Sequence, residues 1–349
     1  GSHVNAATLN GIIQKSYGSG KNLSMATRVF VHALFETYGL LILDADDAAL
    51  KRHFIPYLKE ELKEQICQQK VLSQIASLKN EYTSHYKPQV NPRNLHLFFL
   101  VEGERYRLVK SENGFSWEGK EGATSSEEII KCLEKFPQKF SPNVLFRSLY
   151  QEVILPNIAY IGGGGELAYW LELKSFFDSQ KVLFPILIHR NAALLISEKN
   201  AQKVNKLQLE LKDLFLKRNA LINKKVRQIS NIDLDLSSFK KILETQFDEL
   251  ETLIHQTDAS FEGALNAQKA KQFKGIDNLE ERLLKAQKLK LKDQVERLAL
   301  LHEQLFPGGK LQERVEGFGD FYLENGNFFI DFLMETFDPL SSKFYILET

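Results

Sequence analysis

Four consecutive glycines separate an apolar stretch from a helical pattern near the middle of the sequence. The segment is, in order, Ala159-Tyr160-Ile161-Gly162-Gly163-Gly164-Gly165-Glu166. Glycines between a strand and a helix let backbone N–H groups approach a ligand, and the start of a helix favours an anion there. Glu166 lies in the opening turn, where it could orient an amine or a hydroxyl group. A tight turn that binds nothing, with glycine needed for positive φ, is the alternative.

A second candidate group of polar residues lies about twenty residues before the glycines. Asn143, Arg147 and Gln151 are spaced by four residues, so on a helix they share one face. An arginine at such a place can hold a carboxylate or a phosphate through two parallel hydrogen bonds. The spacing fits the polar wall of a pocket and a capped, solvated helix face equally well.

A third candidate group, His189-Arg190-Asn191, follows the apolar run at residues 184–188. That run is predicted to be a parallel strand, and open α/β sheets bind ligands at the carboxyl ends of their strands. A surface position without a ligand is an equal alternative for these three residues.

Several other kinds of chemistry have no support in the sequence. The glycines are not a P-loop, because no Gly-Lys-Ser/Thr follows them, and they lack the strict dinucleotide-binding spacing. No Gly-x-Ser-x-Gly elbow and no Cys/His pairing indicates a covalent nucleophile. The histidines have no metal-ligand spacing, so we predict no metal site. Cys67 and Cys132 are too few for a disulfide framework and are interpreted as structural.

Composition limits the partners and the compartment. Lys plus Arg and Asp plus Glu each number 45, so the formal net charge is zero and nucleic-acid binding is not expected. No apolar run approaches the roughly 18 residues that a membrane helix needs. We therefore expect a cytoplasmic protein that acts on small molecules.

The first 200 residues have the texture of an α/β domain with an insertion. A helix is predicted over residues 25–38 and ends at Gly39, a buried strand over 40–43, and a helix over 48–68. Residues 95–101, 104–110 and 115–117 predict short antiparallel strands, with Asn113-Gly114 as a hairpin turn, and a helix follows at 125–135. The strand at 159–161, the glycines, a helix beginning at Glu166 and a buried strand at 184–188 predict a parallel crossover unit.

The last 150 residues predict a long helical arm. Apolar residues alternate at spacings of three and four, which is the seam of a coiled coil, in three stretches: Val204, Leu207, Leu211 and Leu214; Ile276, Leu279 and Leu283; Leu291, Val295 and Leu298. A break at residues 230–238 separates two helices, and the second, over 238–305, would extend about 100 Å unless Gly263 or Gly275 bends it. Residues 306–309 end the arm, and 318–337 are predicted to pack back on the body.

The residues around these candidate sites resemble the bacillithiol-biosynthesis cysteine-adding enzymes. The resemblance is carried by the run at residues 140–145, Arg147, Gln151-Glu152, Leu155-Pro156, residues 159–163, Gly165-Glu166, Tyr169, Phe184-Pro185 and Arg190, and extends to residues 38–44, 305–307 and 311–314. Two local departures occur: Gly164 stands where the family has proline, and His189 stands where it tends to have proline.

The resemblance implies a ligase that adds L-cysteine to glucosaminyl-malate by amide formation, the last step of bacillithiol synthesis. Condensing a carboxylate with an amine needs activation, so ATP or another nucleotide is the expected cosubstrate, with no covalently bound cofactor. It also implies a Rossmann core with connective-peptide-like insertions and a coiled coil that pairs two subunits. Glu166 is the candidate catalytic residue; the candidate substrate-binding residues are Asn143, Arg147, Gln151, Tyr160, Gly162, Gly163, Gly164, Gly165, Tyr169 and Arg190.

The predicted fold class is α/β, with a partial Rossmann-like core, a small inserted β/α element and a carboxy-terminal antiparallel helical coiled-coil arm. The predicted divisions are a cloning scar (1–3), core (4–66), insertion (67–139), core with the glycine-rich loop (140–200), coiled-coil arm (201–305) and a segment packing on the core (306–349). Family members carry a further amino-terminal Rossmann half, so this chain alone is expected to be inactive. The alternatives are a non-catalytic coiled-coil dimerisation scaffold and a synthetase-like RNA-binding protein.

Overall fold

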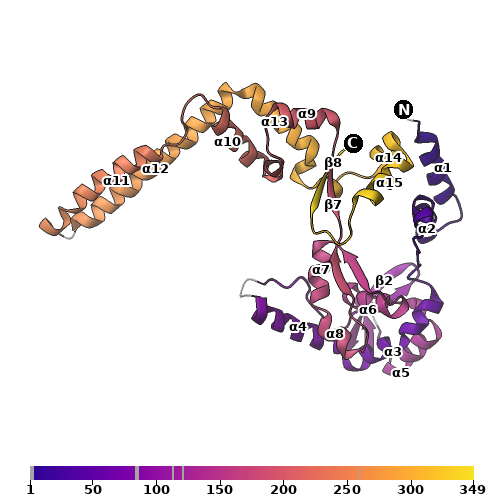
Figure 1. The fold of residues 1–349 in the computed structure, drawn as a ribbon. Helices are drawn as coiled ribbons and strands as arrows, with labels where there is room; N and C mark the ends of the chain where they lie inside the picture. The colour runs from indigo at the N-terminus through magenta and orange to yellow at the C-terminus, as the bar shows by residue number, and fades with distance from the viewer. Residues whose placement is uncertain (1–3, 83–85, 112–113, 120–121, 259) are drawn as a thin grey trace. The chain divides into compact units, whose positions relative to one another are not determined.

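The computed structural model describes residues 4–82, 86–111, 114–119, 122–258 and 260–349 (Figure 1). Residues 1–3, predicted to be a cloning scar, and Asn113 of the predicted hairpin turn lie outside the described residues. The chain divides into two compact units. Unit 1 comprises residues 1–191 and 318–343, and unit 2 comprises residues 192–317 and 344–349.

Unit 1 is mostly helical, and its six described strands form two small sheets. Its helices and strands are α1 (Ala6–Ser16), α2 (Leu23–Phe35), α3 (Ala48–Glu64), α4 (Ile66–Tyr82), β1 (Leu97–Val101), β2 (Glu104–Ser111), β3 (Gly114–Trp117), α5 (Ser126–Lys135), β4 (Phe140–Pro142), α6 (Val144–Ile154), β5 (Ala159–Gly162), α7 (Gly164–Leu171), α8 (Lys174–Ser179), β6 (Ile186–His189), α14 (Gly319–Asn325) and α15 (Asn327–Thr336). The six strands are those of the described part of the unit.

The predicted antiparallel strands are confirmed. Strands β1 to β4 form one antiparallel sheet in the order β3-β2-β1-β4, and Phe98 pairs with Arg107 across the first hairpin. Glu102 and Gly103 form the turn of that hairpin, and both have positive φ. The helix predicted at 125–135 is α5, and Ser125 caps it by accepting a hydrogen bond from Glu128 N at 3.2 Å.

The main core of unit 1 lies between the antiparallel sheet and helices α3 to α8. Its fully buried large side chains include Phe54, Leu97, Phe115, Phe140, Phe146, Trp170, Phe176 and Phe177. Helix α3 packs against α6, and α4 packs against α8. Many of its aromatic rings meet edge to face or tilted, for example Phe99 with Phe140 at 5.1 Å. This packing gives α6 and α7, which carry the candidate residues, a rigid support.

The predicted strand–glycine–helix–strand unit is confirmed, with one correction. Strands β5 and β6 pair in parallel, with Gly162 opposite His189, and α7 and α8 lie between them in the chain. The prediction that the second strand is buried is wrong, because Ile186 is 63% exposed. Within the described residues, β5 and β6 form a sheet of two strands. A strand is buried on both faces only where helices and further strands cover it.

The strand predicted at residues 40–43 is wrong. The preceding helix is confirmed as α2 and a 3₁₀ turn, Glu36–Tyr38, and Gly39 ends it with φ of 71°. The apolar run itself is a loop, and Leu41 is 82% exposed. An apolar run becomes a strand when a neighbouring strand satisfies its backbone N–H and C=O groups, and no strand of the described chain pairs with this one.

The segment predicted to pack back on the body belongs to unit 1, where it forms α14 and α15. Helix α14 packs against α1, and the Asn5 side chain donates a hydrogen bond to Leu323 O at 3.1 Å. The Tyr38 hydroxyl binds the Asp331 carboxylate of α15. Helices distant in the sequence are thereby held together.

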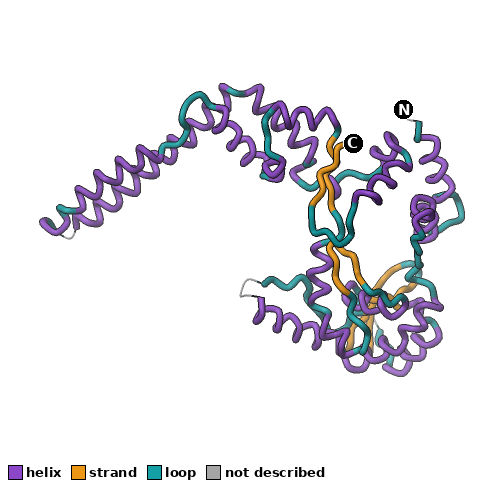
Figure 2. Tube along the Cα trace, viewed as in Figure 1, coloured by secondary structure: helices purple, strands orange, loops and turns teal. Residues whose placement is uncertain are grey.

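The described part of unit 2 consists of helices and one parallel strand pair. Its elements are β7 (Ala192–Ile196), α9 (Glu198–Lys206), α10 (Arg218–Ile229), α11 (Ser237–Glu251), α12 (Ser260–Lys290), α13 (Lys292–Leu305) and β8 (Phe344–Glu348). Figure 2 shows β7 and β8 side by side, with Leu194 opposite Ile346. The core of the unit includes Leu194, Val204, Leu214, Leu221, Val226, Leu298, Leu301 and Leu305.

The helical arm is present, but its predicted course needs two corrections. Residues 238–305 are three helices, and α11 turns back onto α12 as a hairpin (Figure 1). The chain reverses after Thr252, and a second break lies at Leu291; Gly263 and Gly275 lie inside α12. The first leucine series is also not one helix, because a 3₁₀ turn, Leu211–Phe215, follows α9. A spacing of three and four residues identifies an apolar stripe without excluding breaks inside it.

Candidate functional site

Asn143 is the cap residue immediately before helix α6. Its Oδ1 accepts hydrogen bonds from Leu145 N and Phe146 N, each at 3.1 Å. Its own backbone N–H donates to His96 O at 2.7 Å, which ties the start of the helix to the chain before β1. The described hydrogen bonds of Asn143 therefore fix the start of α6. None of them reaches the glycines at residues 162–165.

Arg147 links α6 to α7. Its Nη1 donates to Gln151 Oε1 at 3.2 Å on the same helix, and its Nη2 donates to the Tyr169 hydroxyl at 3.3 Å. All three side chains are half-buried. The predicted row of polar residues is therefore a hydrogen-bonded set, and the guanidinium lies between two helices at the edge of the main core.

Glu152 supports this set, although its type and spacing do not mark it as functional in the sequence. It is 2% exposed, and its Oε1 accepts a hydrogen bond from Gln151 Nε2 at 3.0 Å. The same carboxylate accepts from Asn157 N at 2.9 Å and Asn157 Nδ2 at 3.0 Å. Glu152 thus fixes the turn that leads from α6 into β5. In the sequence, the signal that could have identified Glu152 is an asparagine five residues later, Asn157, beyond Leu155-Pro156.

Tyr160 lies between the core and the glycines. Its ring stacks on Trp170, with centroids 4.1 Å apart. Burial raises the pKa of the Tyr160 phenol, as do the neighbouring Tyr169 and Glu166, while the charge of Arg147 and a hydrogen bond from it act in the opposite direction. The phenol therefore stays protonated at neutral pH and is available as a hydrogen-bond donor.

The glycines have different reasons for lacking a side chain. None of the four has positive φ, so the alternative of a tight turn that requires it is wrong. A Cβ at Gly162 would lie 2.7 Å from Tyr160 Cε1, which makes glycine necessary there. A Cβ at Gly165 would meet no atom within 4 Å, and one at Gly164 would lie 3.6 Å from His189 Nε2. The backbone at Gly164 and Gly165 is thus exposed and accessible.

Glu166 is the third residue of α7, because the helix starts two residues earlier than predicted. Its Oε2 accepts a hydrogen bond from Gly163 N at 2.8 Å, which satisfies one of the N–H groups at the helix start. The residue is exposed, and Oε2 is the carboxylate oxygen that makes this contact. Arg190 follows β6, and its backbone N–H donates to Gly162 O at 2.9 Å.

The arrangement brings together a guanidinium, two phenols and exposed glycine amides at the carboxyl ends of two parallel strands. Such groups can hold an anionic group of a substrate, and a carboxylate beside them can orient an amine. Among the described residues, no group of three or more His, Cys, Asp or Glu side chains could hold a metal ion. No helix in the described part of the chain is long and apolar enough to span a membrane.

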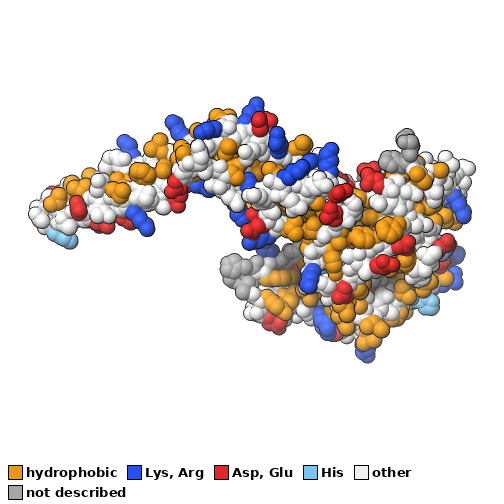
Figure 3. All heavy atoms as spheres, turned by 45° about the horizontal axis from the view of Figure 1, so that its top comes forward, with side chains coloured by type: hydrophobic (Ala, Val, Ile, Leu, Met, Phe, Trp, Pro, Cys, Tyr) orange, Lys and Arg blue, Asp and Glu red, His pale blue; other side chains and the backbone are white. Residues whose placement is uncertain are grey.

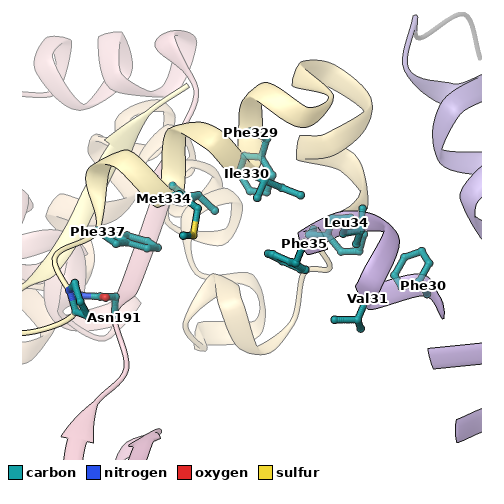
Figure 4. A pocket seen from close by; sticks show the side chains of 12 residues that line it. Phe30, Val31, Leu34, Phe35, Asn191, Phe329, Ile330, Met334 and Phe337 are labelled. Atoms are coloured by element: carbon teal, nitrogen blue, oxygen red, sulfur yellow. The ribbon is translucent and has the colours of Figure 1, made fainter. Parts of the chain in front are cut away.

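A separate apolar cavity of about 660 Å³ lies between α2 and α14–α15 of unit 1. Figure 4 shows side chains of α2 on one side of it and side chains of α15 on the other. Its only polar side chain is Asn191, whose Nδ2 donates to Asp338 O at 2.9 Å. The cavity therefore offers apolar surface and little to carry out a reaction.

The chain matches two family profiles. The profile of the Bacillithiol biosynthesis BshC N-terminal Rossmann-like domain matches residues 1–191, and that of the BshC C-terminal coiled-coil domain matches residues 193–349. The chain belongs to the BshC family. This confirms the resemblance and the predicted fold class, a Rossmann-like domain followed by a coiled-coil domain.

Relatives in the BshC family are similar along nearly the whole chain. A protein of Flavobacterium johnsoniae is 48% identical over 347 residues, which are 99% of this chain and 65% of the relative. A protein of Christiangramia forsetii is 47% identical over 99% of this chain and 64% of its own length, and one of Bacillus thuringiensis is 27% identical over 90% and 59%. Each carries the name "Putative cysteine ligase BshC". The chain thus spans about 65% of the length of its more similar relatives.

Proposed function

We propose that this chain is part of a cysteine ligase that forms an amide bond between L-cysteine and glucosaminyl-malate, the last step of bacillithiol biosynthesis. The observation that carries the proposal is the set Arg147, Tyr160 and Tyr169 beside the exposed glycines that follow β5. Membership of the BshC family and the printed names of the relatives support a cysteine ligase. The site would act in the cytoplasm.

In the proposed reaction, the amine nitrogen of glucosaminyl-malate attacks the carbonyl carbon of cysteine. A free carboxylate is a poor acceptor for this attack, so ATP or another nucleotide has to activate it as a cosubstrate; the activating group then leaves with the bonding electrons, and the amine loses a proton. Arg147 and the N–H groups of Gly164 and Gly165 would hold the malate carboxylates. Glu166, held by Gly163 through Oε2, would orient the amine with its other oxygen.

Binding of glucosaminyl-malate to the chain, measured by calorimetry, tests the assignment. Arg147→Ala should weaken binding about tenfold or more, because a charge-assisted hydrogen bond is lost, and Glu166→Gln should weaken it less. Arg52→Ala removes an exposed arginine from α3 and serves as the matched control. Arg147 also joins α6 to α7, so thermal unfolding of each variant is measured in parallel. Equal binding by Arg147→Ala, Glu166→Gln and the unchanged chain would rule out this site.

We also propose that two copies pair through the arm. Figure 3 shows hydrophobic side chains along the α11–α12 hairpin, and the exposed ones include Phe239, Ile242, Leu279 and Leu289. An exposed apolar stripe on a long hairpin is stabilised by a partner helix. Light scattering should give the mass of a dimer for the chain and of a monomer for Ile242→Glu. A monomer for the unchanged chain at working concentration would contradict the proposal.

A further inference from the structure

The buried carboxylate of Glu152 is connected to Arg147 through one side chain, that of Gln151. Gln151 Nε2 donates to Glu152 Oε1 at 3.0 Å, and Gln151 Oε1 accepts from Arg147 Nη1 at 3.2 Å. Arg147 Nη2 in turn donates to the Tyr169 hydroxyl at 3.3 Å. A continuous row of hydrogen bonds therefore runs from a buried carboxylate to the guanidinium of the candidate site.

The direction of each hydrogen bond in this row is fixed by the chemistry of its two ends. A guanidinium only donates hydrogen bonds, and an ionised carboxylate only accepts them. Gln151 must therefore turn its amide oxygen towards Arg147 and its amide nitrogen towards Glu152. Because the amide group is planar, the position of the Glu152 carboxylate determines where the oxygen that receives Arg147 lies.

The contact between Gln151 and Glu152 is not one that helix geometry produces by itself. Neighbouring residues of a helix point in different directions, whereas residues four apart share a face. Arg147 and Gln151 share a face in this way, but Glu152 points to another side of α6, where Asn157 N donates to it at 2.9 Å and Asn157 Nδ2 at 3.0 Å. Gln151 thus links the face that carries Arg147 to the turn that leads into β5.

Glu152 is itself firmly held. It is 2% exposed, and burying a carboxylate costs free energy unless hydrogen bonds satisfy its oxygens. Three N–H groups, one from Gln151 and two from Asn157, donate to this carboxylate. Asn157 Nδ2 also donates to Leu155 O at 2.7 Å, so the residue that holds Glu152 is fixed by the backbone of the turn.

The guanidinium at the other end of the row keeps donors for a ligand. Arg147 is half-buried at the edge of the main core, and it forms hydrogen bonds with Gln151, Tyr169 and Tyr160. A guanidinium carries more N–H groups than these bonds use. The orientation that Gln151 imposes therefore decides which way the remaining N–H groups point.

We propose that Glu152 is the positioning residue for Arg147: acting through Gln151, it holds the guanidinium in the orientation in which the remaining N–H groups meet a carboxylate of the substrate. Glu152 itself does not touch the substrate. The identity of the substrate, glucosaminyl-malate, rests on the proposed function. The coupling of Glu152 to Arg147 is a property of the chain that is measured without a ligand.

Exchanging residues 151 and 152 separates this role from a purely structural one. Glu152→Gln removes the group that only accepts, so the Gln151 amide is free to turn, and binding of glucosaminyl-malate to the whole 349-residue chain, measured by calorimetry, should weaken about tenfold. The double variant Gln151→Glu with Glu152→Gln again turns an acceptor towards Arg147, so it should recover most of the binding.

A Glu152 that serves only to hold the turn at Asn157 predicts a different result, because the double variant still lacks a carboxylate at residue 152. The proposal is overturned if the double variant binds no better than Glu152→Gln. The control is Glu127→Gln on the exposed surface of α5, which should leave binding and unfolding unchanged.

The second measurement is urea unfolding of Arg147→Ala, Glu152→Gln and the variant that carries both changes. Their effects should be non-additive by at least about twofold in the unfolding equilibrium constant, because the two residues belong to one hydrogen-bonded row. The coupling should disappear when every protein of the comparison also carries Gln151→Ala. Additive effects with Gln151 in place would overturn the proposal.

The outcomes distinguish the positioning role from the proposed function. Coupled unfolding, together with no binding of glucosaminyl-malate by the unchanged chain, would contradict the proposed function and support the link from Glu152 to Arg147. Binding that is weakened by Arg147→Ala but not by Glu152→Gln would overturn the positioning role alone.

Discussion

At the scale of single residues, Glu61 and His96 form a fully buried pair in the body of unit 1. Arg93 N donates to His96 Nε2 at 3.3 Å, so the ring proton is on Nδ1, which donates to Glu61 Oε1 at 2.7 Å. Glu61 Oε2 accepts from Cys67 N at 3.2 Å. Burial, together with the Glu61 charge, raises the pKa of the Cys67 thiol well above its usual range. Cys67 therefore stays an unreactive thiol, as expected for a structural residue.

The buried end of the glycine run, Gly162, and its exposed end, Gly165, should respond differently to an added methyl group. Gly162→Ala places a Cβ against the Tyr160 ring and should destabilise the protein by about 1–3 kcal/mol. Gly165→Ala meets no atom within 4 Å and lies inside α7, so it should preserve or slightly raise stability while it hinders a ligand at the backbone. Urea unfolding and glucosaminyl-malate binding measure the two effects. Equal unfolding of both variants would show that the Tyr160 ring does not exclude a side chain at residue 162.

The raised pKa of Tyr150 predicts how the free energy of unfolding changes in alkaline solution. Burial, followed by the charges of Asp46, Asp47 and Asp44, raises its pKa from 10.0 to about 12, and its hydroxyl donates to Ala45 O at 2.9 Å. The folded protein keeps this proton where the unfolded chain loses it, so the contribution is complete below pH 10 and is lost as the pH rises towards 12.

Tyr150→Phe should therefore lower stability by about 1 kcal/mol at pH 7, because the hydrogen bond to Ala45 O is lost. It should also reduce the loss of stability above pH 10. The test is a series of urea titrations at pH 7 to 11, with exposed Tyr82→Phe as the control. A Tyr150→Phe curve parallel to that of the unchanged chain would contradict the assignment.

At the scale of elements, the α11–α12 hairpin is held by a narrow apolar seam and by ion pairs along its edges. Phe247 of α11 and Leu265 of α12 are buried apolar residues of this seam, at 5% exposure each. Lys269 of α12 lies 2.9 Å from Glu251 and 3.3 Å from Asp248 of α11, and such exposed pairs contribute little. The stability of the hairpin therefore depends on the apolar seam.

Phe247→Ala should destabilise the hairpin by about 3 kcal/mol, within the range for a buried aromatic residue. Hydrogen exchange, read by mass spectrometry, should show faster exchange in α11 and the first half of α12 and little change in α13. The matched control is exposed Glu244→Ala in the same helix. If both variants exchange alike, the seam does not hold the hairpin.

At the scale of the whole molecule, each unit has a core of its own, and the chain passes between the units at residues 191–192, 317–318 and 343–344. Separate cores predict separate unfolding transitions. Calorimetry should resolve two transitions. Glu61→Ala should lower only the transition of unit 1, because removing one partner of a buried pair costs about 3 kcal/mol, and Phe247→Ala should affect only unit 2. Exposed Glu64→Ala is the control for the first, and one transition shifted by both variants would contradict independent cores.

Local pattern was sufficient for most elements of this protein. Backbone geometry and nearby hydrogen bonds define where several elements end, at Gly39, at the hairpin turn Glu102-Gly103 and at the cap Ser125. Neighbouring residues therefore suffice to predict these element ends. The apolar run at 159–161, followed by glycines, likewise predicted β5 and α7. The spacing of Arg147 and Gln151 also predicted from the sequence that these two side chains share one helix face.

Only the tertiary structure decided the remaining features, because each depends on a partner far away in the chain. Residues 40–43 are as apolar as a buried strand, but no strand of the described chain pairs with them. The seam at 238–305 fits one long helix or a hairpin, and contact between α11 and α12 selects the hairpin. Gly162 is required by the Tyr160 ring, whose position is fixed by Trp170 through core packing.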